Sequence, residues 1–173
     1  MSTHTSDGSA VEQTNDVRFA CDAMCGGLAR WLRGIGYDAT WSADIDDGEL
    51  VQQAADEGRV LLSSDTGMFE RRPISSGQVR ALLVPRGLRR MEQLEYVVQQ
   101  LKLQVRLPRC MTCGGRLLPA TREEVAGEVP ARSLVWANTF YRCDRCTKVF
   151  WEGSHWRRIS KVRETTANLT AAR

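Results

Sequence analysis

The sequence lacks any apolar run that approaches the roughly 20 residues a membrane-spanning helix needs. Its first sixteen residues also lack the apolar core and the basic start of a secretory signal peptide. We therefore predict a disordered tail over 1–16 and no association with a membrane. Together these absences favour a cytoplasmic protein, in which cysteine thiols stay reduced.

What is present fits a folded globular chain. The 173 residues are 42% hydrophobic and 26% charged, enough for one full domain and a small second one. The net charge of +3 is unevenly spread: residues 1–101 hold 10 Lys/Arg and 15 Asp/Glu, whereas residues 102–173 hold 14 and 6. This asymmetry predicts cation binding in the first part and polyanion binding in the second. The alternative is that the surface charge varies without functional meaning.

Four of the six cysteines form two C-x₂-C pairs. In a reducing compartment such pairs indicate a metal site more often than a disulfide or a redox dithiol. Each pair can place both sulfurs about 2.3 Å from one zinc ion, and four thiolates leave no open coordination position. Gly114 and Gly115 supply backbone freedom to the first turn, and 122–133 is expected to form a loop. We predict a structural zinc ion held by Cys110, Cys113, Cys143 and Cys146.

Strand-like and helix-like segments alternate along the first part of the chain. Apolar runs predict strands and amphipathic spacing predicts helices. The strands are expected at 17–21, 38–42, 59–63 and 79–84, and the helices within 26–37, 46–58 and 90–103. This alternation predicts an α/β fold with a parallel sheet and right-handed crossovers. Cys21 and Cys25, which lie outside the paired set, are expected in its core.

Acidic residues follow two of these strands. Asp22 and Asp65 each come just past a carboxyl end, where open parallel sheets form their binding crevice. If the two strands are neighbours, the two carboxylates converge. Clustered carboxylates suit Mg²⁺ or Mn²⁺, which can activate water for phosphodiester cleavage. Further ligands could come from the acidic run at 44–49, although Asp46 is also a plausible helix N-cap and an aspartate after a strand is common in turns.

Aromatic and basic side chains gather after the second cysteine pair. Such a combination suits single-stranded RNA, whose bases stack on rings and whose phosphates pair with cations. The predicted RNA contacts are Arg30 and Arg33 on one helix and His155, Trp156, Arg157 and Arg158 near the C-terminus. The alternative for the tryptophans is that Trp151 and Trp156 pack the core of the small module.

Three stretches resemble one known family. The runs "RFACDAMCGGLARWLRGIGYDA" and "DIDDGELVQQAADEGRVLLSSD", followed by the cysteine pairs and "FWEGSHWRRI", are similar to the Mut-seven C-terminal RNase family. The resemblance implies a PIN-like nuclease domain over 17–104 and a zinc ribbon over 105–160, which leaves 161–173 as a flexible tail. It implies Asp22 and Asp65 as ligands of a catalytic Mg²⁺ or Mn²⁺ ion.

The resemblance also implies that Asp46 and Glu49 complete the catalytic acids and that a hydroxyl residue, Ser63 or Ser64, precedes the later aspartate. The sequence departs from the family pattern in two places: Ala23 stands where an acid often follows the first aspartate, and Pro85 and Arg86 stand where a further acid is common. The expected function is a metal-dependent ribonuclease. The alternative is a weak or inactive adaptor that binds RNA, tRNA or the ribosome.

Overall fold

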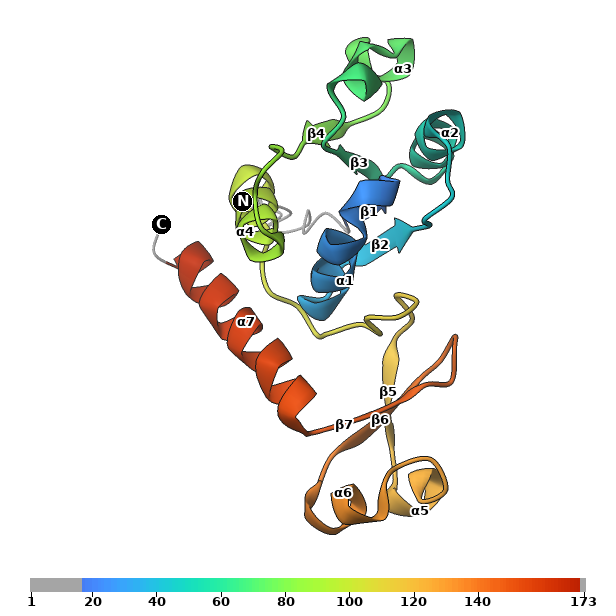
Figure 1. Cartoon of the computed structure of the whole chain (residues 1–173), viewed down its shortest axis with the longest axis vertical. Helices are drawn as coiled ribbons and strands as arrows, with labels where there is room; N and C mark the ends of the chain where they lie inside the picture. Colours follow the sequence, from blue (N-terminus) through green and yellow to red (C-terminus); the bar gives the residue numbers. More distant parts are fainter. Residues whose placement is uncertain (1–16, 172–173) are drawn as a thin grey trace, which may run out of the picture.

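The computed structural model of the chain describes residues 17–171 (Figure 1). The predicted tail over 1–16 and residues 172–173 lie outside the described residues. The side chains of Ser154, His155, Thr170 and Ala171 lie outside them as well.

A parallel sheet forms the centre of the first part, as the sequence predicts. Its strand order is β2-β1-β3-β4, and all three pairings are parallel. Cys21, the last residue of β1, lies opposite Trp41 on one side and Leu62 on the other. The four strands are β1 (Arg18–Cys21), β2 (Asp38–Trp41), β3 (Val60–Ser63) and β4 (Ala81–Leu83).

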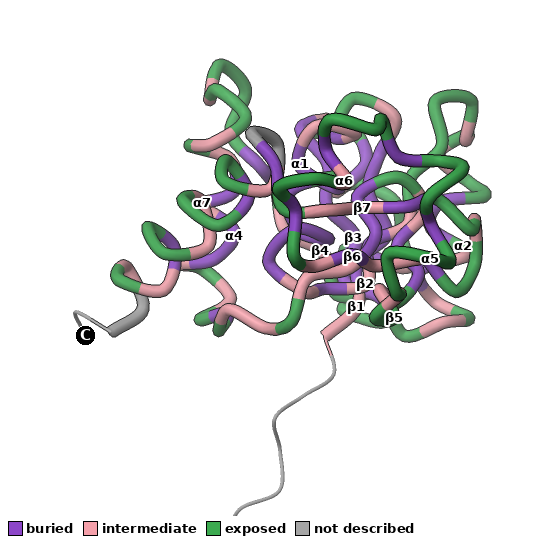
Figure 2. The backbone as a smooth tube through the Cα atoms, turned by 90° about the horizontal axis from the view of Figure 1, so that it is seen from below, coloured by how far each residue is buried: buried purple, intermediate pink, exposed green. Residues whose placement is uncertain are grey.

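Helices cover both faces of this sheet. Because side chains alternate along a strand, Phe19 of β1 packs with α1 and α4 whereas Ala20 packs with α2. Cys21 and Cys25 are 0% and 1% exposed, which confirms their prediction as core residues. Figure 2 shows the buried residues gathered around the strands. The helical elements are η1 (Ala23–Cys25), α1 (Gly26–Gly34), α2 (Asp47–Glu57), η2 (Thr66–Glu70), α3 (Arg72–Ser75) and α4 (Arg90–Leu101).

The cysteine-rich part contains a small antiparallel sheet, in the order β5-β6-β7. The segment 122–133, expected as a loop, instead contributes to two short helices that share a core with Phe140. Val125 and Val129 drive this difference, since they are 0% and 5% exposed. The elements are β5 (Leu117–Ala120), α5 (Arg122–Val125), α6 (Ala131–Trp136), β6 (Phe140–Cys143) and β7 (Val149–Trp151).

A long helix, α7 (Ser154–Ala171), crosses the predicted boundary between ribbon and tail. It leaves β7, where Trp156 still contacts Tyr141 of the small sheet, and runs back along α4 (Figure 1). The predicted flexible tail is helical over 161–171 because Ile159 and Val162 join the core beneath α1 and α4, and Thr166 is 2% exposed. These positions recur at helical spacing, which is a signal that the sequence contains.

Arg33 links the two parts and is not an RNA contact. Its side chain is 6% exposed, and its Nε donates to the Ala39 carbonyl at 2.8 Å. Its Nη1 donates to the carbonyls of Met111 at 3.3 Å and Thr112 at 2.8 Å, within the first cysteine turn. We therefore correct the prediction for Arg33: its guanidinium is committed to backbone acceptors and anchors the cysteine turn on α1.

Replacing Arg33 with alanine is expected to lower the free energy of unfolding by about 3 kcal/mol, because three backbone carbonyls, two of them buried, lose a charged donor. Arg30→Ala is the matched control, since Arg30 is exposed on the same helix and should cost no more than about 0.5 kcal/mol. Urea unfolding of both variants measures the difference. Equal, small changes in the two variants would contradict the anchoring role.

Candidate active site and metal centre

One serine hydroxyl connects the two strand-end acids, Asp22 and Asp65. The Asp22 amide donates to the Leu62 carbonyl at 3.0 Å, which extends the β1–β3 ladder by one residue. The Asp22 carboxylate, 8% exposed, accepts a hydrogen bond from Ser63 Oγ at 2.5 Å. Ser63 Oγ in turn accepts from the Asp65 amide at 2.9 Å. The Asp22 carboxylate and the backbone amide of Asp65 therefore meet at one hydroxyl, at the carboxyl ends of the neighbouring strands β1 and β3.

Asp65 has an arginine partner that the sequence did not suggest. Its Oδ1 accepts from the Gly67 amide at 3.2 Å, which caps η2, and from Arg86 Nη2 at 3.3 Å. Arg86 Nε donates to the Ser64 carbonyl at 2.7 Å. The Asp65 and Arg86 side chains are 44% and 66% exposed, so their ion pair is weak and open to exchange with a ligand. Arg86 thus places positive charge where the family pattern would have an acid.

The other two predicted acids lie at the start of α2. Asp46 caps that helix, since its Oδ1 accepts from the Glu49 amide at 2.9 Å. Both side chains are exposed, and Asp47 beside them pairs with Arg71 at 3.0 Å. Within the described residues, only the four cysteines form a group of three or more metal-ligating side chains. The structure therefore joins Asp22 with Asp65 through Ser63 and leaves Asp46 and Glu49 apart as helix-end acids.

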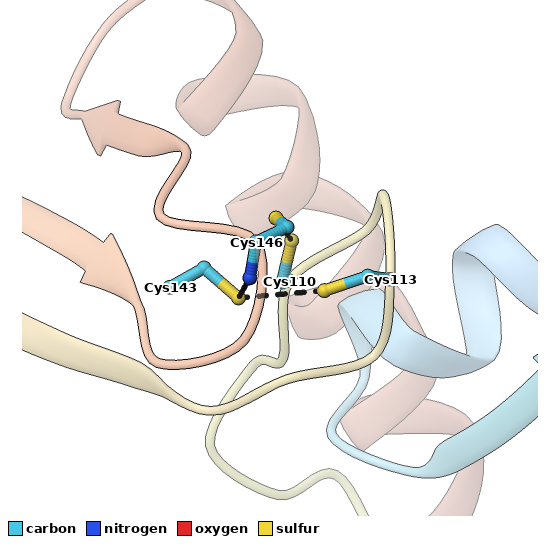
Figure 3. A group of neighbouring side chains, drawn as sticks. All are labelled: Cys110, Cys113, Cys143 and Cys146. Atoms are coloured by element: carbon cyan, nitrogen blue, oxygen red, sulfur yellow. Dashed lines mark hydrogen bonds between the residues drawn. The ribbon is translucent and has the colours of Figure 1, made fainter.

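The four cysteines converge from two turns, as Figure 3 shows. The Sγ atoms of Cys110 and Cys146 are 3.6 Å apart, and those of Cys113 and Cys143 are 3.4 Å apart. All four sulfurs lie within 4.8 Å of one another. A tetrahedral zinc ion with bonds of about 2.3 Å would need sulfur separations near 3.8 Å. The arrangement can hold zinc after only a slight expansion.

Backbone amides and one glycine shape this cysteine cluster. The amides of Arg145 and Cys146 donate to Cys143 Sγ at 3.4 and 3.5 Å. Burial raises the pKa of Cys143, but these amide donors, together with the neighbouring thiols of Cys113 and Cys146, lower it to about 7. A Cβ at Gly115 would lie 2.6 Å from Cys143 Sγ, whereas Gly114 adopts a φ of +80°. Gly114 provides the turn conformation that the sequence predicted, and Gly115 leaves space for the sulfur of Cys143.

Arginines surround the first cysteine turn. Arg109 Nη1 donates to the Gly114 carbonyl at 2.8 Å, and Arg145 Nη1 donates to the Cys113 carbonyl at 3.1 Å. With Arg33, they offer positive charge around four thiolates whose zinc complex carries a net charge of −2. The cations favour the ionised thiolates, and the carbonyl contacts fix the turn. This closed thiolate set suits a structural ion and not a reacting one.

The remaining predicted RNA contacts lie at the start of α7 and on α1. Trp156 stacks on Tyr141, with ring centroids 5.2 Å apart and planes at 12°, and it also packs against the main core. Trp151 packs against the small core, which confirms that alternative for it. Arg158 lies over the Trp31 ring at 5.9 Å. Arg30 and Arg157 are exposed, and the side chain of His155 lies outside the described residues.

Comparison with known proteins decides the family. The Mut7-C RNAse domain model matches residues 17–163, which include the strand-end acids and all four paired cysteines. The chain belongs to this family. The chain is also similar to the human protein named "Exonuclease mut-7 homolog", with 32% identity over 101 residues. That match covers 56% of this chain and 11% of the human protein, so the chain spans only a small fraction of its relative's length. No solved structure matches.

Membership of the Mut7-C family supports a nuclease-like function with a nucleic acid as the substrate. It confirms the resemblance drawn from the sequence motifs. Over residues 17–171, no helix has both the length and the apolar character needed to cross a bilayer.

Proposed function

We propose that this Mut7-C chain is a metal-dependent ribonuclease whose catalytic acids are Asp22 and Asp65. The observation that carries the proposal is the hydrogen-bonded link through Ser63 Oγ, at the carboxyl ends of neighbouring parallel strands. This edge is where open α/β sheets place their reactive groups. The link joins the Asp22 carboxylate and the backbone amide of Asp65, which lie 2.5 and 2.9 Å from the serine oxygen.

Two carboxylates are sufficient ligands for Mg²⁺ or Mn²⁺ in a nuclease. Mg²⁺ is commonly bound by one or two carboxylates together with waters and substrate phosphates, and not by a complete protein cage. Asp22 and Asp65 would hold the ion, and Asp46 or Glu49 would contribute through water or after a shift of the α2 start. When bound, such an ion supplies an activated water and stabilises the leaving oxygen of the phosphodiester.

The side chains around the ion have separate tasks. The Ser63 hydroxyl donates to Asp22 Oδ2, which fixes the carboxylate and leaves its other oxygen for a ligand. Arg86 offers a guanidinium that can leave Asp65 and pair with the RNA phosphate, since both partners are substantially exposed. Positive charge beside the scissile group would stabilise the charge that develops during cleavage.

The cysteine cluster is proposed to hold one structural zinc ion, and the basic module around it to bind RNA. Residues 102–173 carry eight more Lys/Arg than Asp/Glu, 14 against 6. Such a surface attracts a polyanion at long range and is screened by salt. The four reduced thiols also suit the cytoplasm, which is our proposed location.

A second candidate is an RNA-, tRNA- or ribosome-binding adaptor without efficient cleavage. The observation in its favour is the ion pair between Arg86 and Asp65, at 3.3 Å, together with Ala23 and Pro85 at positions where related nucleases place acids. If that ion pair persists on RNA binding, Asp65 loses its capacity as a ligand. RNA would then be bound and not cut.

Metal dependence separates the two candidates. Zinc-loaded protein is incubated with labelled structured and unstructured RNA, with and without Mn²⁺ or Mg²⁺, and the products are resolved on a gel. The nuclease proposal predicts cleavage only with the added ion, and its loss in Asp65→Asn. RNA binding without cleavage under all conditions would overturn the nuclease and support the adaptor.

A further inference from the structure

A small cavity lies where the cysteine module meets the parallel-sheet part. Its volume is about 240 Å³, and three regions line it: α1, the first cysteine turn, and the segment from β7 to the start of α7. The residues that matter for its chemistry are Arg30, Met111, Lys148, Phe150, Trp151 and Trp156. The cavity is distinct from the strand-end acids, none of which contributes to its lining.

The lining has an apolar floor and a basic rim. Met111 and Val149 are 5% and 8% exposed, so they form the buried floor. Arg30 and Lys148 are exposed and lie on opposite parts of the chain, one on α1 and one beside β7. No Asp or Glu lines the cavity. The basic side chains at the entrance would attract a negatively charged ligand, and the apolar residues inside would contact an uncharged ring.

Three aromatic residues line the cavity, and one of them, Trp151, also packs against the small core. Phe150, Trp151 and Trp156 are all partly exposed. Trp156 is held in place by its stack on Tyr141, at 5.2 Å between centroids. A ring fixed before binding loses little conformational entropy when a ligand stacks on it. The site is therefore prepared for a flat aromatic ligand.

We propose that this cavity is a nucleobase-binding subsite that holds one unstacked base of a single-stranded RNA. The aromatic rings would stack the base, while Arg30 and Lys148 would pair with its flanking phosphates. The volume suits a single base and is smaller than the roughly 300 Å³ at which drug-sized sites begin. This inference rests on the proposed RNA-directed function and adds a defined position for the strand.

The competing occupant is an aromatic side chain of a protein partner. A peptide would use the same rings, but it would not need two cations at the rim. The arginine on α1 and the lysine beside β7 thus favour a phosphate-bearing ligand. The test below includes a tryptophan-containing peptide so that either occupant can be recognised.

The test measures RNA binding apart from cleavage. Zinc-loaded Asp22→Asn protein is titrated with a labelled single-stranded RNA of about ten nucleotides, a length that fits known site sizes. Adding Phe150→Leu and Lys148→Ala together is expected to weaken binding at least about tenfold, since stacking one base and pairing one phosphate are both lost. Arg80→Ala, which removes an exposed arginine outside both the cavity and the basic module, is the control and should bind like the parent.

Crosslinking identifies the occupant directly. RNA carrying 4-thiouridine should crosslink to the β7 and α7 residues of the cavity, as mapped by mass spectrometry. Unchanged RNA affinity in the double variant would overturn the subsite. So would cavity substitutions that weaken binding of the peptide but not binding of RNA. If wild-type protein cleaves RNA while the cavity variants bind normally, only the subsite fails. If the cavity variants lose binding and the wild type never cleaves, only the nuclease fails.

Discussion

Asp22→Asn is expected to lower kcat for RNA cleavage by at least about 100-fold while leaving RNA affinity nearly unchanged. The amide oxygen of asparagine can still accept the hydrogen bond from Ser63, so the local geometry should survive. What is lost is the negative charge that binds a divalent ion. Single-turnover cleavage with saturating protein measures the chemical step.

Two further variants show whether that effect belongs to the site. Asp56→Asn removes an exposed carboxylate from α2 and should cleave at the wild-type rate. Ser63→Ala keeps both carboxylates but removes the hydroxyl that holds the Asp22 carboxylate, so a fall of about tenfold is expected from misplacement of Asp22. An Asp22→Asn protein with an unchanged rate would exclude this carboxylate from catalysis.

Cys110→Ser is expected to reduce the zinc content from about one ion per chain to nearly none. A structural zinc ion contributes about 10–16 kcal/mol of apparent binding free energy, which supports the fold around it. The small antiparallel sheet has only a modest core of its own, so it should unfold, whereas the parallel sheet should remain folded. Elemental analysis gives the zinc content, and amide hydrogen exchange locates the unfolded segment.

Cys25→Ser is the matched control for the zinc prediction. Cys25 is 1% exposed in the main core and lies outside the cysteine cluster. Burial raises the pKa of its thiol to about 11, so it stays protonated and has no tendency to bind metal. Its replacement should lower stability but leave zinc bound. Full zinc occupancy in Cys110→Ser would refute the four-cysteine site.

Local sequence patterns were sufficient to predict the parallel sheet and the cysteine cluster. The strands β1 and β3 can be recognised in the sequence because both are almost completely buried and therefore appear as short, mainly apolar runs. The C-x₂-C spacing directly encodes a turn that presents two sulfurs. The sequence left open whether β1 and β3 are neighbours, because the crossover rule fixes the handedness of a connection and not the strand order. The structure places β1 beside β3, which brings the ends of these strands to one edge.

Long-range contacts were beyond that kind of inference. Arg33 looks like any surface arginine on an amphipathic helix until residues 111 and 112 fold against it. The ion pair of Arg86 with Asp65 joins residues from two different crossovers. Helix α7 is a partial exception: Ile159 and Val162 stand at helical spacing in the sequence, but the surface on which they pack includes α4, which is distant in the sequence. Each case depends on a partner that is distant in the sequence.

Binding of Mn²⁺ tests most directly the claim that Asp22 and Asp65 together form a metal site. Zinc-loaded wild type and the Asp22→Asn/Asp65→Asn double variant are titrated with Mn²⁺, and electron paramagnetic resonance follows the free ion. If the site exists, the wild type binds about one or two more Mn²⁺ ions per chain than the double variant does. Equal uptake by the two proteins would contradict the site.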